Sequence, residues 1–530
     1  MNPRTLARKD EPSGWMLGMA LVIVGLSFII QSMYEASVAL TALVAVGLIL
    51  AATRIGPKRS HTGRARFRPP LVLVPALLFS AWYFITVKFG DFGVGPILFH
   101  MDYGVQANGV VGEFLATSYL PLGSIAALVV GLWLVAATDF RFRRLDRVLV
   151  VPLLVVNPFT IALLEYVGDA QASSERPLVE RYIEPAAIEA PAGDGRPNLL
   201  HIFLESSEAT LREPAFGDVL GPLDSFAGRG LQLTDLREAA LTNWTLAGQV
   251  AAHCGVPLMP IGLISLNSFH VIEGGFLSGA ECLGDLLSRD GYETTFMKAA
   301  PLGFAGTDKF VASHGWRNRL GYPQLRPDYP LGGSEWGLDD EDAYDAAYRE
   351  VVRLAGSGGP WALSLTNIGG HAPRGYVSRS CHGRPSVDAI ADPTLKAFRC
   401  THELAAELLT RLEEGGYLEN TVVVVQSDHL AMRNSIYRAL KRHDRRNLFF
   451  AFGPGIEPER IDRPMTMVDV YPTILELIGY APPGGRAGIG VSALAPSETL
   501  VEERGLRALD KAIYADFELR NRLWGMQAGS

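Results

Sequence analysis

The sequence is poor in cysteine and has no excess of basic residues, and each shortage excludes a class of protein. It contains four cysteines in 530 residues, and no two of them have the spacing of a zinc finger. The formal net charge is −8, and residues 151–530 carry 34 basic against 48 acidic groups. An acidic domain is a poor ligand for a polyanion, so we expect no nucleic-acid binding.

Long apolar runs are concentrated in the first third of the chain. Apolar residues make up 48% of the sequence, and the mean hydropathy is positive, which is unusual for a wholly soluble protein. The second apolar run follows the first too closely for the first to be a cleaved signal peptide. We therefore expect residues 1–166 to form a membrane anchor of five transmembrane helices, each close to the roughly 20 residues that a span requires. The expected spans are residues 15–31, 36–53, 69–88, 119–137 and 148–166.

Clusters of basic residues flank these spans in three places. By the positive-inside rule, the segments that carry them face the cytoplasm, and an odd number of crossings then exports everything after residue 166. The expected product is a membrane-embedded, multi-pass protein with an extracytoplasmic domain. The basic clusters are Arg4, Arg8 and Lys9; Arg54, Lys58, Arg59, Arg64, Arg66 and Arg68; and Arg141, Arg143, Arg144 and Arg147.

Residues 167–197 are polar and interrupted by proline and glycine, which is typical of a juxtamembrane linker with little apolar material to bury. All four cysteines lie beyond this linker, on the expected outer side. An even number of cysteines in an oxidising compartment indicates disulfides, with three possible connectivities. Sequence proximity favours Cys254 with Cys282 and Cys381 with Cys400, and four reduced thiols are the alternative.

Residues 198–530 predict an α/β domain with a central, mostly parallel sheet. Short apolar strands alternate here with amphipathic helices, which is the pattern of a sheet covered on both faces. The tail up to Trp524 predicts one or two further amphipathic helices. Strands are expected at 198–205, 360–366, 421–426 and 447–452, and helices at 343–354, 394–413 and 466–478.

Two of the expected strands end in side chains that bind metals. The run of β-branched residues at 421–426 leads to Asp428 and His429, and the strand from residue 198 ends in Glu205. Parallel strands deliver such residues to one open edge of the sheet. Taken singly, Glu205 could be an ordinary acid at a strand end, and the Asp-His pair a turn. Together they favour a divalent cation, with Mn²⁺ or Mg²⁺ preferred and Zn²⁺ possible.

Thr245 precedes an apolar run that looks like the first turns of a helix. A hydroxyl in this place lies among unpaired amide donors, which attract anions such as phosphate. Threonine is a weak nucleophile unless a metal or a base activates it, and an isolated threonine here is usually only a helix cap. Beside Glu205, Asp428 and His429 it becomes a candidate nucleophile and fourth metal ligand.

The motifs around these residues resemble those of the sulfatase-like phosphoglycerol transferases. This group belongs to the alkaline phosphatase superfamily, together with lipoteichoic acid synthases and lipid A phosphoethanolamine transferases. The similarity extends over about residues 198–480 and is strongest to the branch that modifies osmoregulated periplasmic glucans. The strings that carry it are Asn198–Ser206, Trp244–Gly248 with Cys254-Gly-Val-Pro257, Glu335–Leu338, Ser427–Met432 and Arg446–Phe450.

The resemblance implies an alkaline-phosphatase/sulfatase-like fold and a role for each matching residue. Thr245 would be the catalytic nucleophile and would bind one metal ion, most readily Mn²⁺, together with Glu205, Asp428 and His429. His371 and Trp336 would contact the substrate. Two further candidates, Lys298 and Arg374, are better interpreted as solvated surface charges.

The implied reaction is transfer of phosphoglycerol from phosphatidylglycerol to a periplasmic glucan through a phospho-threonine intermediate. The implied location is the bacterial inner membrane, with the catalytic domain in the periplasm. A phosphoethanolamine transferase, or a glycerophosphate polymerase similar to lipoteichoic acid synthase, would share the threonine and the metal. A domain that binds glucan or lipid without turnover is the non-enzymatic alternative.

A true sulfatase is disfavoured by a missing motif. Such enzymes require cysteine or serine in a Cys/Ser-x-Pro-x-Arg string for conversion to formylglycine, and the sequence contains none. The string that begins at Cys254 has its proline one position too late and no arginine close behind it.

Overall fold

The computed structural model describes residues 177–184, 196–261 and 274–526, positions 188, 191, 269 and 272, and, before residue 170, residues 16–25 with a few single positions. The chain divides into two compact units, Met1–Leu98 with Gly104–Gly168 and Phe99–Tyr103 with Asp169–Ser530. Residues 16–25 of the first expected span are described and helical, and a few positions of the other spans are described; the rest of the five expected spans lies outside the described residues. Among the residues that are described, no helix has both the length and the apolarity for a membrane crossing.

The second unit is built on an eight-stranded, mostly parallel sheet with the strand order β5-β4-β6-β1-β7-β8-β2-β9. Its centre is β1, which pairs in parallel with β6 on one side and β7 on the other. Only β8 runs antiparallel to its neighbours. The strands are β1 (Asn198–Leu204), β2 (Leu231–Leu233), β4 (Glu293–Lys298), β5 (Asn318–Leu320), β6 (Trp361–Thr366), β7 (Thr421–Ser427), β8 (Phe449–Phe452) and β9 (Glu459–Ile461).

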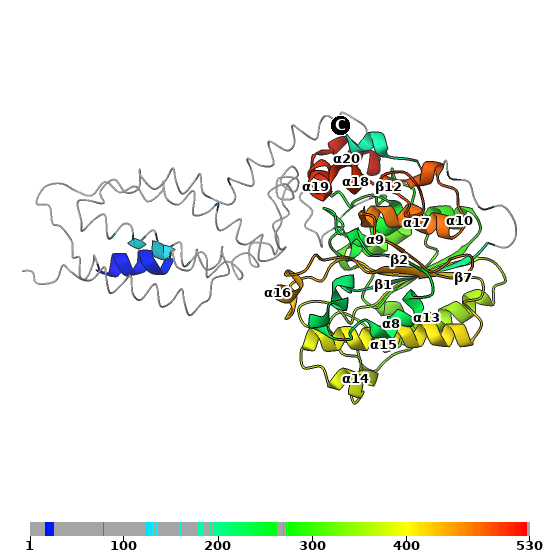
Figure 1. Cartoon of the computed structure of the whole chain (residues 1–530), viewed down its shortest axis with the longest axis horizontal. Coiled ribbons are helices and arrows are strands. Elements are labelled where there is room, and N and C mark those ends of the chain that lie inside the picture. Colours follow the sequence, from blue (N-terminus) through cyan, green and yellow to red (C-terminus); the bar gives the residue numbers. More distant parts are fainter. Residues whose placement is uncertain are drawn as a thin grey trace, which may run out of the picture. The chain divides into compact units, whose positions relative to one another are not determined.

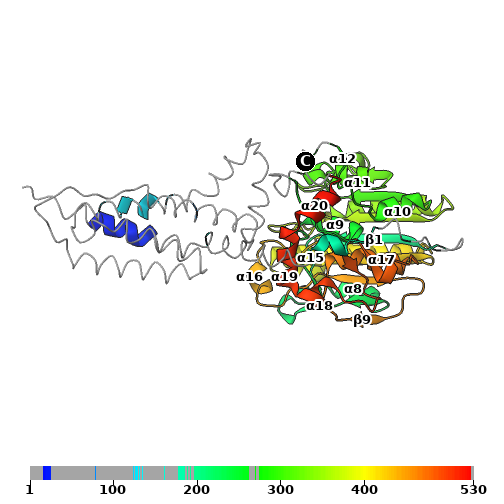
Figure 2. The ribbon, with the colours of Figure 1, turned by 90° about the horizontal axis from the view of Figure 1, so that it is seen from above.

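The central strands are apolar on both faces because helices cover the sheet from both sides (Figures 1 and 2). Leu199 and Phe203 of β1 belong to one buried cluster, and Leu200 and Ile202 to the other. In Figure 1 one helical layer contains α9 (Thr245–Cys254), α10 (Leu283–Arg289) and α17 (Val470–Leu477). The opposite layer contains α8 (Gly221–Ala227), α13 (Asp340–Ala355) and α15 (Pro393–Glu414). The expected α/β architecture is confirmed.

All four expected strands and all three expected helices are present, with ends shifted by up to three residues. The helix expected at 466–478 consists of a 3-10 turn, η9 (Met467–Asp469), followed by α17. The remaining short elements are η4 (Ala209–Arg212), η5 (Pro214–Phe216), β3 (Leu236–Arg237), η7 (Phe304–Gly306), α11 (Thr307–Ser313), α12 (Tyr322–Leu325), η8 (Arg379–Cys381), α14 (Pro385–Asp388), α16 (Tyr437–Leu440), β10 (Met465–Thr466), η10 (Pro483–Gly485), β11 (Arg486–Ala487) and β12 (Gly490–Val491).

Both expected disulfides are formed, Cys254–Cys282 and Cys381–Cys400. The first joins the end of α9 to the residue before α10, and the second joins η8 to α15. Each bridge closes a short loop between elements that pack next to each other. The proximity argument therefore selected the right connectivity among the three.

The C-terminal tail forms three helices, α18 (Leu500–Arg504), α19 (Leu506–Ala515) and α20 (Phe517–Leu523). They contact the 3-10 turn η2 (Leu178–Arg181), whose Val179 N–H donates to Asp516 Oδ2 at 3.0 Å. The guanidinium of Arg522 lies 4.8 Å from the ring centre of Tyr182. Leu178 is completely buried here, so this part of the expected linker does bury apolar material.

Candidate active site

The three residues expected to bind a metal lie together at the carboxyl edge of the sheet. Glu205 follows β1, and Asp428 and His429 follow β7, which is the next strand and is paired in register with β1. All three side chains are buried, and their candidate ligand atoms lie within 4.8 Å of one another. His429 Nε2 is 3.4 Å from Glu205 Oε1 and 3.4 Å from Asp428 Oδ2.

Thr245 joins this cluster from α9, in the helical layer that also contains α10 and α17. It is the first residue of α9, and its hydroxyl donates to Glu205 Oε2 at 3.2 Å. The helix can approach so closely because Gly248, one turn later, has no side chain: a Cβ there would lie 1.7 Å from the carbonyl oxygen of Asp428. The sequence thus places a hydroxyl at a helix start directly against a buried carboxylate.

A hydrogen-bond network holds the ligand side chains in place. Ser206 N–H donates to Asp428 Oδ1 at 2.8 Å, and its hydroxyl donates to Glu205 Oε1 at 2.8 Å. Ser206 adopts a positive φ of 59°, a conformation that costs a non-glycine residue about 1–3 kcal/mol. The His429 ring places Nδ1 2.8 Å from the carbonyl oxygen of Leu430, which turns Nε2 toward the carboxylates. Sequence reasoning did not single out Ser206.

The chemistry of the cluster fits a divalent cation. Asp428 Oδ2 is buried and has no hydrogen-bond partner among the described residues, which is costly unless a cation satisfies it. Burial and the charge of Glu205 raise the pKa of Asp428 to about 7. Burial lowers the pKa of His429, but the two carboxylates outweigh it and raise that pKa to about 10. The two carboxylates therefore favour a positive charge between them. A metal ion bound there would supply that charge and would displace the proton from His429.

His371 and Trp336, the expected substrate contacts, lie against each other. Their ring centres are 4.3 Å apart, and Trp336 also approaches Phe304 at 6.0 Å. The loop after β6 that carries His371 packs closely on the backbone of Glu205. Only glycine fits at position 370, because a Cβ there would lie 2.1 Å from the Glu205 carbonyl oxygen. Both rings are half-buried, and their role in substrate binding stays a prediction.

The interpretation of Lys298 as a solvated charge is wrong. Lys298 ends β4 with 3% exposure, and its ammonium group donates to Thr307 Oγ1 at 3.2 Å. Burial lowers the pKa of Lys298 to about 8, although the charges of Glu205 and Asp428 raise it. This lysine therefore places a cationic group near the metal-ligand cluster, whereas Arg374 is exposed as expected.

Comparison with known proteins identifies the domain. The family model described as Sulfatase matches residues 245–480, a range that contains Thr245, His371, Asp428 and His429. Residues 245–480 form a sulfatase-family domain.

Relatives and solved structures agree with this assignment. Phosphoglycerol transferase I of Escherichia coli O127:H6 is 28% identical over 418 residues, which cover 77% of this chain and 54% of the relative. The chain therefore spans about half the length of the curated relatives it matches. A protein of the alkaline phosphatase superfamily from Vibrio parahaemolyticus superposes with a TM-score of 0.50 and 20% identity, covering 68% of this chain and 97% of that protein. At this identity the superposition indicates a shared fold and nothing of the reaction.

In the sulfatase-family domain, Asp340 anchors the loop that carries His371. Its Oδ1 accepts the N–H groups of Ile368 at 3.0 Å and Gly369 at 2.9 Å. Its Oδ2 accepts the side chain of Asn367 at 2.8 Å, and Asn367 Oδ1 in turn accepts the backbone N–H of Glu205 at 2.7 Å. One buried carboxylate at the start of α13 thus fixes both the histidine loop and a candidate metal ligand.

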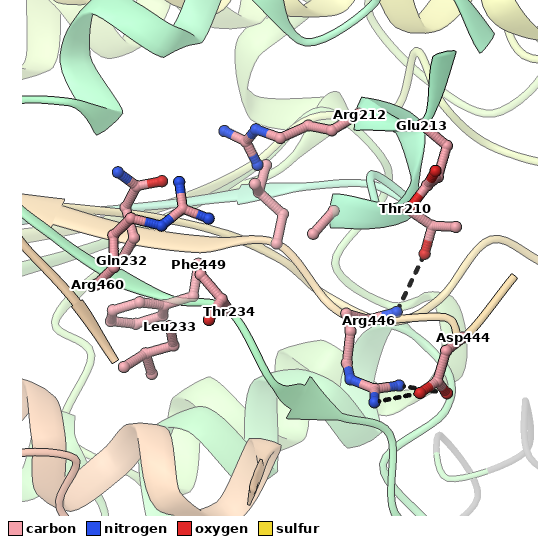
Figure 3. Close-up of a pocket in the computed structure, with 12 residues that line it drawn as sticks. Thr210, Arg212, Glu213, Gln232, Leu233, Thr234, Asp444, Arg446, Phe449 and Arg460 are labelled. Atoms are coloured by element: carbon pink, nitrogen blue, oxygen red, sulfur yellow. Dashed lines mark hydrogen bonds and ion pairs between the residues drawn. The ribbon is translucent and has the colours of Figure 1, made fainter. Parts of the chain in front are cut away.

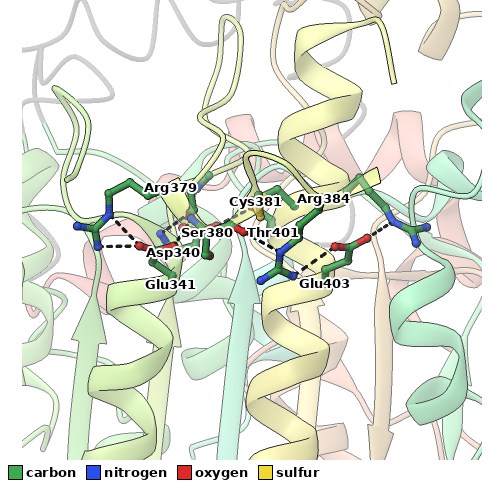
Figure 4. Close-up of a disulfide and its surroundings, with 12 residues drawn as sticks. Asp340, Glu341, Arg379, Ser380, Cys381, Arg384, Thr401 and Glu403 are labelled. Atoms are coloured by element: carbon green, nitrogen blue, oxygen red, sulfur yellow. Dashed lines mark hydrogen bonds and ion pairs between the residues drawn. A yellow bond between two sulfur atoms is a disulfide. The ribbon is translucent and has the colours of Figure 1, made fainter. Parts of the chain in front are cut away.

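The Cys381–Cys400 bridge lies beside this anchor (Figure 4). Thr401, the residue after Cys400, donates to Asp340 Oδ2 at 2.6 Å. On the other side, Asp340 N–H donates to Ser378 Oγ at 3.1 Å, three residues before Cys381. The disulfide therefore joins the two segments that hold Asp340 in place.

Two buried groups hold the loop after His429 in the sulfatase-family domain. Arg445 binds both carboxylate oxygens of the fully buried Glu208, at 2.6 and 2.8 Å, and donates to the carbonyl oxygen of Ala431 at 2.7 Å. Glu238 Oε2 accepts the N–H of Leu430 at 2.7 Å. Sequence reasoning missed both groups because they act through contacts distant in sequence, and the only signal was the Arg-rich string before β8.

Proposed function

We propose that this chain transfers phosphoglycerol from phosphatidylglycerol to a periplasmic glucan, with Thr245 as the nucleophile at a divalent-metal site. The observation that carries the proposal is the 3.2 Å hydrogen bond from the Thr245 hydroxyl to Glu205 inside the buried carboxylate and imidazole cluster. The similarity to relatives named phosphoglycerol transferase I supports the choice of phosphoglycerol as the transferred group.

The residues that would hold the cation are Glu205, Asp428, His429 and Thr245. Three of the four donate oxygen, which favours Mn²⁺ or Mg²⁺ and permits Zn²⁺; we expect Mn²⁺. When bound, such an ion lowers the pKa of a coordinated hydroxyl and neutralises charge on phosphoryl oxygens.

The first step forms a phosphodiester on Thr245. Thr245 Oγ1 forms a bond to the phosphorus of phosphatidylglycerol and loses its proton to solvent, while the bond from phosphorus to the diacylglycerol oxygen breaks. His371 donates a proton to the departing oxygen, so diacylglycerol leaves as a neutral alcohol. Thr245 then carries phosphoglycerol.

The second step returns the enzyme to its starting state. A glucan hydroxyl forms a bond to the phosphorus and gives its proton to His371, while the bond from phosphorus to Thr245 Oγ1 breaks and the threonine regains a proton. Covalent transfer of this kind predicts ping-pong kinetics. Lys298 contributes a fixed positive charge beside the phosphoryl group in both steps.

The proposed membrane location serves the first step. A five-helix anchor over residues 1–166, with the sulfatase-family domain in the periplasm beyond the linker 167–197, keeps the domain near the leaflet that presents phosphatidylglycerol. Tethering of this kind raises the effective concentration of the lipid head group without any additional contact.

The test is the intact mass of the full chain in detergent after incubation with Mn²⁺ and phosphatidylglycerol. We expect a glycerophosphate adduct in the wild type and in Thr245→Ser, which keeps a hydroxyl, and none in Thr245→Ala. Release of diacylglycerol by Thr245→Ala at the wild-type rate would reject the nucleophile. An adduct formed from phosphatidylethanolamine and not from phosphatidylglycerol would reject the donor and favour a phosphoethanolamine transferase.

A further inference from the structure

A cavity of about 360 Å³ is lined by none of the candidate metal ligands and has no part in the proposed chemistry. Its walls come from η4 and from the ends of β2, β8 and β9, and include Arg212, Gln232 and Arg460 (Figure 3). This volume is within the range of about 300–1,000 Å³ that is usual for small-ligand sites. Most of its lining is polar side chains, so the cavity suits a ligand that makes many hydrogen bonds.

The register of the sheet places the cavity at the same edge as the metal ligands. Phe449 of β8 pairs with Gln426, two residues before Asp428, and Gln232 of β2 pairs with Phe450 and with Arg460 of β9. Strands lie about 4.8 Å apart, so β2 and β9 are roughly 10 and 15 Å from β7. A group bound in the cavity is therefore separate from the group that reacts at Thr245.

Hydrogen bonds connect the cavity wall to the segment that follows Glu205. Thr210 lines the cavity and donates to Glu208, the partner of Arg445, and it accepts the N–H of Arg446, another lining residue. Ala209 N–H donates to the carbonyl oxygen of Arg446 at 2.8 Å. This wall continues directly into the segment of Glu205 and the loop that follows His429.

The charges around the cavity argue against a phosphate ligand. Arg446 is held by Asp235 and binds Asp444 with two hydrogen bonds at 2.7 and 2.6 Å, and Arg212 binds Asp224 at 2.9 Å. The lining itself contains two carboxylates, Asp444 and Glu213, and three guanidinium groups, of which Arg446 and Arg212 are already paired. An anion would therefore find two of the three guanidinium groups engaged, whereas neutral hydroxyl groups can use the remaining lone pairs and N–H groups of the Arg–Asp pairs.

Arg460 is the lining guanidinium group that remains available to a ligand. In the described part of the chain its side chain makes no hydrogen bond or ion pair, and it lies exposed next to Gln232 on the neighbouring strand. In Figure 3 its side chain extends toward the same side of the cavity as those of Gln232 and Arg212. A guanidinium next to a primary amide offers several donors and one acceptor, the combination that a vicinal diol of a sugar satisfies.

From this arrangement we infer that the cavity is a binding subsite for a neutral sugar unit of the acceptor glycan, distant from the hydroxyl that reacts. The inference rests on the proposed function, because it assigns the acceptor side of that reaction. It predicts that acceptors long enough to fill the cavity are used better than short ones, through a lower acceptor KM.

The test compares two arginines at equivalent positions. Arg460 and Arg319 are the middle residues of β9 and β5, the two edge strands of the same sheet, and both are exposed. We would measure binding of a β-linked glucose hexasaccharide to the full chain in detergent, in the Thr245→Ala background so that no turnover occurs. Arg460→Gln should weaken binding on the order of tenfold, as expected for lost hydrogen bonds to a charged group, and Arg319→Gln should leave it unchanged.

Three outcomes would overturn the inference: equal hexasaccharide affinity in the two arginine variants, no binding by the wild type, or Arg460-dependent binding of glycerol phosphate in place of the sugar. The Thr245 adduct with phosphatidylglycerol requires no acceptor, so it separates the two proposals. An adduct that forms normally in Arg460→Gln, together with a raised acceptor KM and an unchanged kcat, supports the subsite. Absence of the adduct in the wild type would reject the proposed function itself.

Discussion

The carboxylate of Asp340 accepts the backbone N–H of Gly369 at 2.9 Å and thereby fixes the first turn of α13 to the loop that carries His371. The same carboxylate holds Asn367, which binds the backbone of Glu205. A candidate metal ligand and a candidate proton donor, which follow different strands, thus depend on one buried side chain. Supporting groups of this kind commonly change metal affinity or activity by about 10–100-fold when removed.

The first prediction concerns this anchor. In Asp340→Asn an NH₂ group replaces one carboxylate oxygen. That NH₂ group faces side-chain or backbone groups that also donate hydrogen bonds, so the loop that carries His371 should shift. We expect kcat to fall by about 10–100-fold and the affinity for Mn²⁺ to weaken, with a smaller change in KM. Glu341→Gln is the control, because Glu341 is adjacent but binds Arg379 and Ser380 outside the site. Equal losses in both variants would mean that Asp340 only stabilises the helix.

The second prediction concerns metal removal. A chelator should abolish adduct formation on Thr245, and Mn²⁺ should restore it. Because a cation binds the folded state only, saturation at 100 times its Kd should stabilise the domain by about 2.7 kcal/mol. Calorimetry should show this stabilisation in the wild type and lose it in Asp428→Asn. Retention of the full stabilisation in Asp428→Asn would place the ion elsewhere.

The third prediction concerns the close approach of α9 to Asp428. Gly248→Ala places a Cβ 1.7 Å from the Asp428 carbonyl oxygen, so helix and loop must separate and Thr245 must leave Glu205. We expect loss of activity and a destabilisation of about 1–3 kcal/mol in chemical denaturation. Gly359→Ala, which meets no atom within 4 Å, is the matched control and should be nearly neutral. A fully active Gly248→Ala variant would contradict the close packing of α9 on the Asp428 backbone.

The fourth prediction concerns pH. Burial and the nearby charge of Glu238 raise the pKa of Asp510 on α19 to about 7, above the ordinary value of 3.8, although the N–H of Ala240 binds it at 2.7 Å. A raised carboxyl pKa contributes stability below pH 3.8 that is lost as the pH rises toward 7. Between pH 5 and 8 the unfolding free energy of the wild type should therefore fall relative to Asp510→Asn, by an amount on the order of 1–3 kcal/mol. If the unfolding free energies of the two proteins change in parallel between pH 5 and 8, the raised pKa of Asp510 is disproved.

The sequence was sufficient for the parts of the fold that local patterns specify. The valine run of β7 and the apolar run of β1 can be predicted as strands, because central parallel strands are buried on both faces. The ends of these two strands place Glu205 beside Asp428 and His429. Thr245 could be placed at a helix start for the same local reason. The cysteine pairs followed from sequence proximity.

The rest depends on contacts distant in sequence. The short strands β2, β5 and β9 have three residues each, too few to show a period of two. Lys298 was misinterpreted because β4 contains threonines and a glutamate, so its sequence does not look like a buried strand. Asp340 lies in the acidic first turn of a helix, where solvent exposure is the ordinary outcome, and only the folded chain brings it to Gly369.

The contact between η2 and the C-terminal helices has a practical consequence. Val179 binds Asp516 and Tyr182 lies under Arg522, so the segment that precedes β1 and the C-terminal helices run next to each other. A domain with adjoining termini can be inserted into a surface loop of a host protein, or circularly permuted, without stretching its backbone. The α/β domain from η2 to α20 is thus suited to insertion into a host protein.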